Sequence, residues 1–271
     1  MAFMSSQFFV YVNSQDRLNQ ADTNSNFTYN IALPQDHKFT HVSLIDATIP
    51  KSYYLIQSGY NTFQLTEGAT TVTITVPIGN YQLSQWTTTL TSLLTTNSPN
   101  GWVYTVTYPF PSTSGELGKL LYTVSGNTSQ PILTFGAVMY EPFGFRQSSS
   151  NQFSSSQLLS TTVIKLQSED RLLLHCDIIN NPGNDNVLAA INAGTVVPMS
   201  TIVYENQEPD IITHELTSDN IKTIRITLQD ENGIEQILNG LNMNLTLMFY
   251  KKEPVWDTFR RYVELEALKN K

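Results

Sequence analysis

Apolar and polar side chains alternate one by one in many short segments of this chain, and this pattern constrains its fold more than any other feature. Residues 222–228 (KTIRITL) show it most clearly, because single polar residues separate the apolar ones. A period of two is expected of a β-strand with one buried face. Turn-forming residues follow at 230–233 and 239–240, and a second apolar segment occupies 245–250. The pattern predicts the closing strands of a sheet.

The same alternation predicts strands throughout the chain, and turn residues separate them. Two pairs of segments are expected to form hairpins, 62–65 with 71–76 and 102–108 with 119–124. Other strands are expected at 8–12, 26–33, 39–49, 132–135, 163–166, 171–179 and 199–204. Many short strands without regular strand-helix alternation favour an antiparallel β-sandwich.

Three segments depart from the strand pattern. Residues 83–94 have apolar side chains at helical spacing, which predicts one internal helix with Ser84 as a cap. The run YEPFGF at 140–145 indicates a compact aromatic turn. Residues 148–160 are rich in Ser and Gln, and we interpret them as a long surface loop rather than a domain boundary.

Composition excludes several classes of protein. Charged residues form 14% of the chain and the formal net charge is −8, so sequence-specific nucleic-acid binding is not expected. Cys176 is the single cysteine and cannot form an intramolecular disulfide. The start MAFMSSQFF has neither a basic region nor a long apolar run, which argues against a secretion signal. No apolar run approaches the roughly 20 residues of a membrane span, so the chain is not expected to be transmembrane.

The last part of the chain differs from the rest in its net charge and in its helical pattern. From Lys251 onward there are six basic and four acidic residues, a net charge of +2 against −10 for the rest. Pro254 can open a helix at its first position. The side chains of Trp256, Phe259 and Val263 then fall on one face of that helix. Such an amphipathic tail either packs on its own domain or docks on a neighbouring subunit.

No catalytic pair stands out among the reactive side chains. Cys176 follows His175, but neighbouring residues of a strand point to opposite faces, so thiol and imidazole are not expected to pair. A buried structural cysteine is the simpler interpretation. Glu205, Glu208 and Asp210 form an acidic cluster, and a solvated loop explains them better than a glycosidase pair.

Metal binding is equally weakly supported, and no cofactor is expected. His214-Glu215 begins like a zinc-helix motif, but Ser218 stands where the second histidine is required. Asp230 and Asn232, with Glu235 nearby, offer oxygen ligands, yet their spacing does not match a calcium loop. A hairpin turn already explains these residues.

A succession of short motifs gives the chain a family resemblance. In the first part these are Asp16-Arg17, Asn26-Phe27-Thr28, Ile49-Pro50, Tyr53-Tyr54, Tyr60-Asn61-Thr62-Phe63 and Ile78-Gly79-Asn80-Tyr81. In the second part they are Phe143-Gly144-Phe145, Tyr204-Glu205-Asn206, Ile224-Arg225-Ile226, Asp230-Glu231-Asn232-Gly233, Leu238-Asn239-Gly240 and Leu245-Thr246-Leu247. From residue 16 to residue 250 this succession resembles the penton, or minor capsid, proteins of virophages, polinton-like elements and related large DNA viruses.

The resemblance implies a single jelly-roll β-sandwich that assembles as a homopentamer at the fivefold vertices of an icosahedral virion. It implies contacts with major capsid proteins and other minor capsid proteins, assembly inside the host cell, and loops available to a host receptor. We therefore expect an N-terminal arm and first strand at 1–24, a jelly-roll domain at 25–250 with inserted hairpins at 63–124, and a helical tail at 251–271. The residues expected at the subunit interface are Phe8, Phe9, Tyr11, Trp256, Phe259, Arg260, Arg261 and Val263.

Two other functions are compatible with a jelly roll. A carbohydrate- or receptor-binding module would use exposed aromatic side chains, for which Tyr53, Tyr54, Trp102 and Tyr104 are the candidates. A glycosidase would require an acid pair such as Glu205 and Glu208. The missing secretion signal weighs against a secreted lectin, and the absence of a convincingly placed acid pair weighs against an enzyme.

Overall fold

The computed structural model describes residues 7–34, 38–108, 118–136, 138–147, 149–167, 170–180, 186–209, 211–218 and 220–252. The chain divides into two compact units. The first consists of Met1–Tyr53 together with Glu169–Lys271, and the second of Tyr54–Ser168. The second unit is therefore an insertion into the first.

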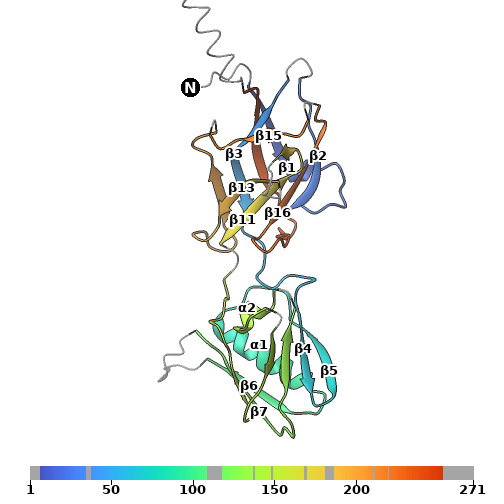
Figure 1. Cartoon of the computed structure of the whole chain (residues 1–271), viewed down its shortest axis with the longest axis vertical. Helices are drawn as coiled ribbons and strands as arrows, with labels where there is room; N and C mark the ends of the chain where they lie inside the picture. The colour runs from blue at the N-terminus through green and yellow to red at the C-terminus, as the bar shows by residue number, and fades with distance from the viewer. Residues whose placement is uncertain are drawn as a thin grey trace, which may run out of the picture. The chain divides into compact units, whose positions relative to one another are not determined.

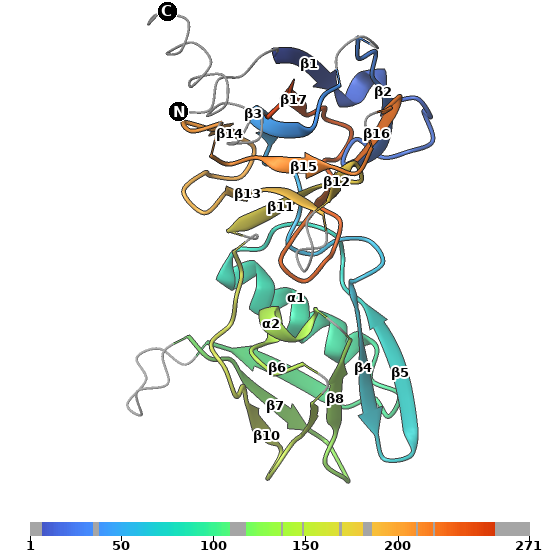
Figure 2. The same ribbon diagram turned by 45° about the horizontal axis from the view of Figure 1, so that its top comes forward.

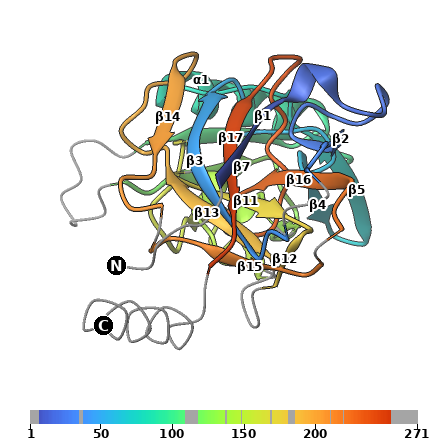
Figure 3. The same cartoon turned by 90° about the horizontal axis from the view of Figure 1, so that it is seen from above.

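Two antiparallel sheets form the first unit, and Figure 3 shows strands of the first sheet side by side. The first sheet has the order β1 (Gln7–Asn13), β17 (Asn244–Tyr250), β3 (His41–Pro50), β15 (His214–Leu216) and β12 (Ile179–Asn180), with β14 (Thr201–Glu205) also paired to β3. The second sheet has the order β13 (Val187–Asn192), β11 (Arg171–Cys176), β16 (Thr223–Gln229) and β2 (Asn26–Asn30).

The path of the chain through these sheets is that of a jelly roll (Figure 1). Strand β1 lies in the first sheet, β2 in the second and β3 in the first again. After the inserted unit, β11 and β13 belong to the second sheet. The chain returns to the first sheet at β14, crosses again at β16 and ends at β17. Two packed sheets with this Greek-key connectivity define a jelly roll. The expected all-β jelly-roll sandwich is confirmed.

The buried faces of the two sheets make one core. Leu174, Ile226 and Leu247 are among its fully buried side chains. Burial alternates along β16 as the sequence pattern requires. The expected single strand over 171–179 is instead two strands, because Asp177 and Ile178 turn the chain from β11 into β12 of the other sheet. Strand β11 is buried on one face only.

The inserted unit contains both expected hairpins (Figure 2). Strands β4 (Thr62–Glu67) and β5 (Thr70–Thr75) pair, as do β6 (Val103–Thr107) and β7 (Leu121–Ser125). Three more strands extend these pairs into a four-stranded sheet, β5-β4-β8-β9, and a three-stranded sheet, β10-β7-β6. The added strands are β8 (Ile132–Phe135), β9 (Ser150–Gln152) and β10 (Gln157–Leu159).

Helix α1 (Leu83–Thr96) is the internal helix that the sequence predicts. Two of its threonines, Thr91 and Thr95, lie along the edge of β6, a position that helix propensity does not predict. The backbone N–H of Val106 donates to Thr91 Oγ1 at 2.9 Å, and that of Tyr104 donates to Thr95 Oγ1 at 3.0 Å. The helix thereby satisfies donors of an edge strand. Its N-cap is Gln82 rather than Ser84.

Several segments differ from their expected form. The aromatic turn at 140–145 contains a short helix, α2 (Tyr140–Phe143). The Ser- and Gln-rich segment at 148–160 carries β9 and β10 rather than forming a loop throughout, because neighbouring strands supply backbone partners that composition does not reveal. Residues 163–166 form no strand; Ile164 N–H donates to Gly118 O at 2.8 Å. The insertion expected at 63–124 is part of the larger unit Tyr54–Ser168.

Candidate assembly surface

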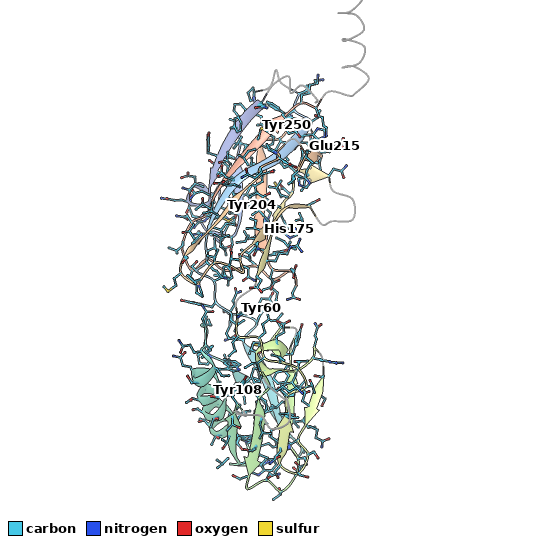
Figure 4. All side chains as sticks on the ribbon, turned by 90° about the vertical axis from the view of Figure 1, so that its left-hand side faces the viewer. Tyr60, Tyr108, His175, Tyr204, Glu215 and Tyr250 are labelled. Atoms are coloured by element: carbon cyan, nitrogen blue, oxygen red, sulfur yellow. The ribbon has the colours of Figure 1, made fainter. Side chains whose placement is uncertain are left out.

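The outward face of the first sheet carries a row of four side chains across four neighbouring strands. Tyr11 of β1 lies opposite Thr246 of β17, Thr246 lies opposite Asp46 of β3, and Asp46 lies opposite Glu205 of β14. The residues beside them in sequence, Val12, Leu245, Ala47 and Tyr204, pack in the core, so the row faces away from it. Figure 4 labels Tyr204, the inward neighbour of Glu205. We call these four residues the outer row.

Strand β1 is at the edge of its sheet and places the predicted interface residues on two faces. Phe9 and Tyr11 are 43% and 74% exposed. Phe8 points the other way: it packs against the core, and its ring centroid lies 6.2 Å from that of Phe39. Phe9 and Tyr11 therefore present aromatic rings at a sheet edge, whereas Phe8 holds the strand on the sandwich.

Apolar side chains border the outer row. Phe9 pairs with buried Met248, which in turn pairs with Ser43 of β3. Ser43 Oγ donates to the carbonyl of Ile212 at 2.7 Å, which fixes the loop after β14 over this part of the sheet. Ile211 and Ile212 of that loop remain 73% and 48% exposed. The row thus lies beside a surface of exposed aromatic and aliphatic side chains.

Asn206 attaches the same loop to β3. Its backbone N–H donates to Ile45 O at 2.8 Å, and its side-chain amide donates to Leu44 O at 3.0 Å. These bonds satisfy backbone groups next to an irregularity in the pairing of β3 with β17, where Asp46 faces Thr246 but Leu44 faces Leu247. The extra residue, Ile45, reverses the alternation and turns Asp46 outward.

The outer row is acidic at one end. Asp46 and Glu205 lie directly opposite each other, and neither forms an ion pair within the described part of the chain. Like charges in this cross-strand position destabilise a sheet unless a cation compensates them. His41, on the same face of β3, does not supply one at neutral pH, because burial, followed by the nearby charge of Lys252, lowers its pKa. The row therefore favours a basic partner.

The remaining predicted interface residues, Trp256, Phe259, Arg260, Arg261 and Val263, lie outside the described residues, as does the tail from 253 onward. The chain is described up to Lys252, whose N–H donates to Thr40 Oγ1 at 3.0 Å. Thr40 N–H donates in turn to Tyr250 O at 3.0 Å. The position from which the tail departs, beyond the end of β17, is thus defined; Tyr250 is labelled in Figure 4.

Cys176 does not have the environment of a nucleophile. The thiol is buried in the jelly-roll core, and this burial raises its pKa to about 12. Neighbouring His175 is only partly buried, whereas Cys176 has its side chain in the core. The thiol remains protonated at neutral pH, so the side chain acts as a small apolar core residue.

The other polar candidates have structural partners. His214 Nε2 is hydrogen-bonded to Leu188 O at 2.9 Å. Asp230 Oδ1 accepts the backbone N–H groups of Asn232 at 2.9 Å and Ile234 at 2.8 Å, which stabilises the turn after β16. Glu235 accepts hydrogen bonds from Ser25 Oγ, Thr23 Oγ1 and Asn26 Nδ2. Among the described residues, no group of three or more His, Cys, Asp or Glu side chains is arranged to hold a metal.

The aromatic set proposed for a carbohydrate site is largely buried. Tyr53, Trp102 and Tyr104 are 1%, 5% and 1% exposed, and only Tyr54 reaches 38%. The hydroxyl of Tyr104 donates to Glu67 inside the inserted unit at 2.7 Å. Three of the four rings are core residues and cannot stack on a sugar.

Within the described chain, no helix is long and apolar enough to cross a membrane.

Part of this surface was not expected from the sequence. Phe9, Tyr11 and Glu205 were singled out, but for unrelated reasons, and Asp46 was not singled out at all. The alternation of inward and outward residues along β3 is the sequence signal for the position of Asp46, but the bulge at Ile45 shifts that alternation by one residue. Ile211 and Ile212 belong to a segment without periodicity, so only the hydrogen bonds of Ser43 and Asn206 reveal their position.

No protein-family model and no curated protein matches this sequence. Among solved structures, the chain is similar to the crystal structure of the selenomethionine-labelled penton protein of mavirus, with 10% identity, 91% of this chain and 99% of that chain covered, and a TM-score of 0.41. It also matches VP17, a capsid protein of bacteriophage P23-77, with 8% identity, 94% and 100% coverage, and a TM-score of 0.15.

Proposed function

We propose that this chain is a structural capsid protein, and that it forms the pentameric capsomer at the fivefold vertices of an icosahedral virion. The observation that carries the proposal is the order of strands in the first unit, β1-β17-β3-β14 facing β13-β11-β16-β2. Jelly rolls with two sheets of this kind are the building blocks of many viral capsids and of some lectins. The capsid role is the one that agrees with the remaining features of the chain.

The distribution of polar side chains supports assembly rather than chemistry. Cys176 is buried and protonated, and the carboxylates of Asp230 and Glu235 accept hydrogen bonds that hold turns in place. A capsomer needs stable sheets and surfaces that face its neighbours. Exposed apolar side chains on a sheet edge, such as Phe9 and Tyr11, suit that requirement. The burial of Tyr53, Trp102 and Tyr104 removes the main support for a carbohydrate-binding module.

In this proposal the subunit contacts involve Phe9 and Tyr11 on β1, with Phe8 holding the strand in place. The tail contributes Trp256, Phe259, Arg260, Arg261 and Val263. Major capsid proteins and other minor capsid proteins surround the pentamer, and assembly takes place inside the host cell. Loops of the inserted unit, where Tyr54 and Tyr60 are 38% and 44% exposed, are available to a host receptor.

Native mass tests the proposal directly. Five copies of the 30.5 kDa chain give a particle of about 152 kDa. Light scattering and native mass spectrometry over a range of concentrations should detect this mass. A chain that stays monomeric at the highest concentration, and that does not bind purified capsomers of the same virus, would contradict the proposal. Deletion of residues 255–271 should leave folding intact but reduce the pentamer.

A further inference from the structure

The outer row has the composition of a docking surface for a basic amphipathic helix. It places Tyr11, Asp46 and Glu205 in one line across the sheet, with Thr246, which is only 8% exposed, between Tyr11 and Asp46. Tyr11 is 74% exposed, and Val203, one pair further along β14, is 63% exposed. The acidic pair therefore has exposed apolar side chains near it, on β1 and on β14.

Loop residues add to this surface. Glu208 lies in the loop after β14, and its carbonyl accepts the N–H groups of Ile211 and Ile212, both at 3.0 Å. Glu208 adds a third carboxylate to the segment that Asn206 ties to β3. Exposed apolar residues bordered by carboxylates are suited to a partner with apolar side chains on one face and cations beside them.

The same chain contains such a segment outside the described residues. Trp256, Phe259 and Val263 are spaced to share one face of a helix, and Arg260 lies beside that face, whereas Arg261 falls on the opposite side. Guanidinium groups pair well with carboxylates in bidentate geometry. The nineteen residues of 253–271, as a helix with a rise of 1.5 Å per residue, would extend about 28 Å, enough to cross several strands spaced about 4.8 Å apart.

The path of the chain favours a row on a second copy. A hydrogen bond between Thr40 and Lys252 holds the chain in place beyond Tyr250. Lys252 is six residues past Thr246. At about 3.3 Å per residue, the tail begins about 20 Å from its own outer row. Lys252, the last described residue, lies past the end of β17 that is farther from the row, so a tail that docks on its own row must reverse its direction relative to β17. Docking on another copy is not subject to this constraint.

We propose that residues 253–271 of one copy dock on the outer row of a neighbouring copy. Trp256, Phe259 and Val263 cover Phe9, Tyr11 and Ile212, while Arg260 pairs with the carboxylates of Asp46 and Glu205. This inference rests on the proposed function, because it requires an assembly of copies. In a closed ring each copy donates one tail and receives another.

Disulfide trapping tests the contact, and the chain suits it because Cys176 is buried and protonated at neutral pH. One full-length chain carries Val203→Cys, and a second chain, with a different mass tag, carries Ala267→Cys, a position at the edge of the apolar face of the tail. After the two are mixed and mildly oxidised, a disulfide-linked heterodimer is expected. The matched control replaces Val203→Cys by Val103→Cys, an exposed strand valine of the inserted unit that is 52% exposed.

Charge variants sharpen the test. Asp46→Lys with Glu205→Lys should lower the cross-link yield about tenfold, as should Arg260→Glu, since about 1.4 kcal/mol corresponds to a factor of ten. Combining both sets of charge changes in the two chains should restore the yield. Circular dichroism and native mass of each sample establish that the variants fold and assemble.

The outcomes separate the docking from the proposed function. A 152 kDa particle with equal yields for the Val203→Cys and Val103→Cys chains overturns the docking and leaves the capsomer proposal standing. A link formed only inside a chain that carries both Val203→Cys and Ala267→Cys overturns docking between copies. A monomer at all concentrations contradicts both proposals. Restoration by the combined charge variants supports the docking.

Discussion

In the jelly-roll unit, the first strand of the described chain, β1, pairs along its whole length with the last, β17. In the inserted unit, β4 pairs with β5 and β6 with β7, which are close neighbours in sequence. Local pairing has a small loop-closure cost, whereas pairing between distant strands must wait for nearly the whole chain. The comparison indicates that the inserted unit can form before the jelly roll is complete.

The two cores also differ in the type of side chain that fills them. The inserted unit is built on aromatic rings: Phe143 lies 4.6 Å from Phe135, 4.7 Å from Phe63 and 5.3 Å from Trp86, measured between ring centroids. The jelly-roll core consists mainly of aliphatic side chains from both sheets. Rings concentrate packing in a few residues, so single substitutions should have large effects in the inserted unit.

The chain provides a separate probe for each unit. Trp86 and Trp102 are both in the inserted unit, so fluorescence reports on it once Trp256→Phe removes the signal of the tail. Cys176 is in the core of the jelly roll, so its labelling reports on that unit.

The largest expected effect is on stability of the inserted unit. Phe143→Ala removes the ring at the centre of the aromatic cluster and should cost about 3–5 kcal/mol. Urea unfolding followed by Trp fluorescence should show this loss, while Cys176 labelling should not change. Phe249→Ala in the jelly roll is the matched control and should reverse the pattern. If each variant shifts both probes equally, the units unfold together and the comparison fails.

Labelling of Cys176 tests the jelly roll itself. Burial raises the pKa of the thiol from 9.0 to about 12 and shields it from reagents, so native protein at pH 8 should react much more slowly than urea-unfolded protein. Because the folded pKa is above the unfolded one, the stability that this group contributes is present below about pH 9 and is lost as the pH rises toward 12. Fast labelling of native protein would show that this core opens readily.

A smaller effect is expected from the buried carboxylate of Glu67 in the inserted unit. It accepts hydrogen bonds from Ser98 Oγ at 2.8 Å, Asn100 N–H at 3.0 Å and Tyr104 OH at 2.7 Å. Glu67→Gln places an amide among these donors and should cost about 1–3 kcal/mol by urea unfolding. Glu231→Gln, which breaks the exposed ion pair with Arg171, is the control and should change stability by less than about 1 kcal/mol. Equal losses would contradict the role of burial.

A comparable effect in the jelly roll should follow from Lys51→Met. Lys51 is 4% exposed, and its ammonium donates to Ala193 O at 2.7 Å and Val196 O at 2.8 Å. The variant leaves both carbonyls without this donor and should cost about 1–3 kcal/mol, measured as faster Cys176 labelling in urea. Trp fluorescence of the inserted unit should be unchanged. A shift in both probes would show that this residue, at the end of β3, couples the two units.

The smallest effect on stability is expected on the outer row. Tyr11→Ser changes a side chain that is 74% exposed and should alter stability by less than about 0.5 kcal/mol. Its effect should instead appear in native mass, as a smaller fraction of pentamer. Leu18→Ser, at a position that is 56% exposed and away from the row, is the control. A Tyr11→Ser chain that assembles like the control would remove this residue from the interface.

The sequence by itself determined the local elements. Alternation located β4, β5, β6, β7, β16 and β17, and helical spacing located α1, because each of these depends on neighbours within a few residues. Low charge and a single cysteine indicated a protein without evident chemistry, and the succession of motifs supplied the jelly-roll expectation. The alternation along β1 puts Phe8 on one face and Phe9 and Tyr11 on the other, but only the structure shows that Phe8 faces the core.

Only the tertiary structure decided which faces are available. It turned Asp46 outward through one extra residue at Ile45, placed Asp46 opposite Glu205, and brought Ile212 over the sheet through Ser43. It also buried Tyr53, Trp102 and Tyr104. A period of two fixes the side of a strand only relative to its own neighbours, and strand pairing, bulges and loop hydrogen bonds then decide which residues meet.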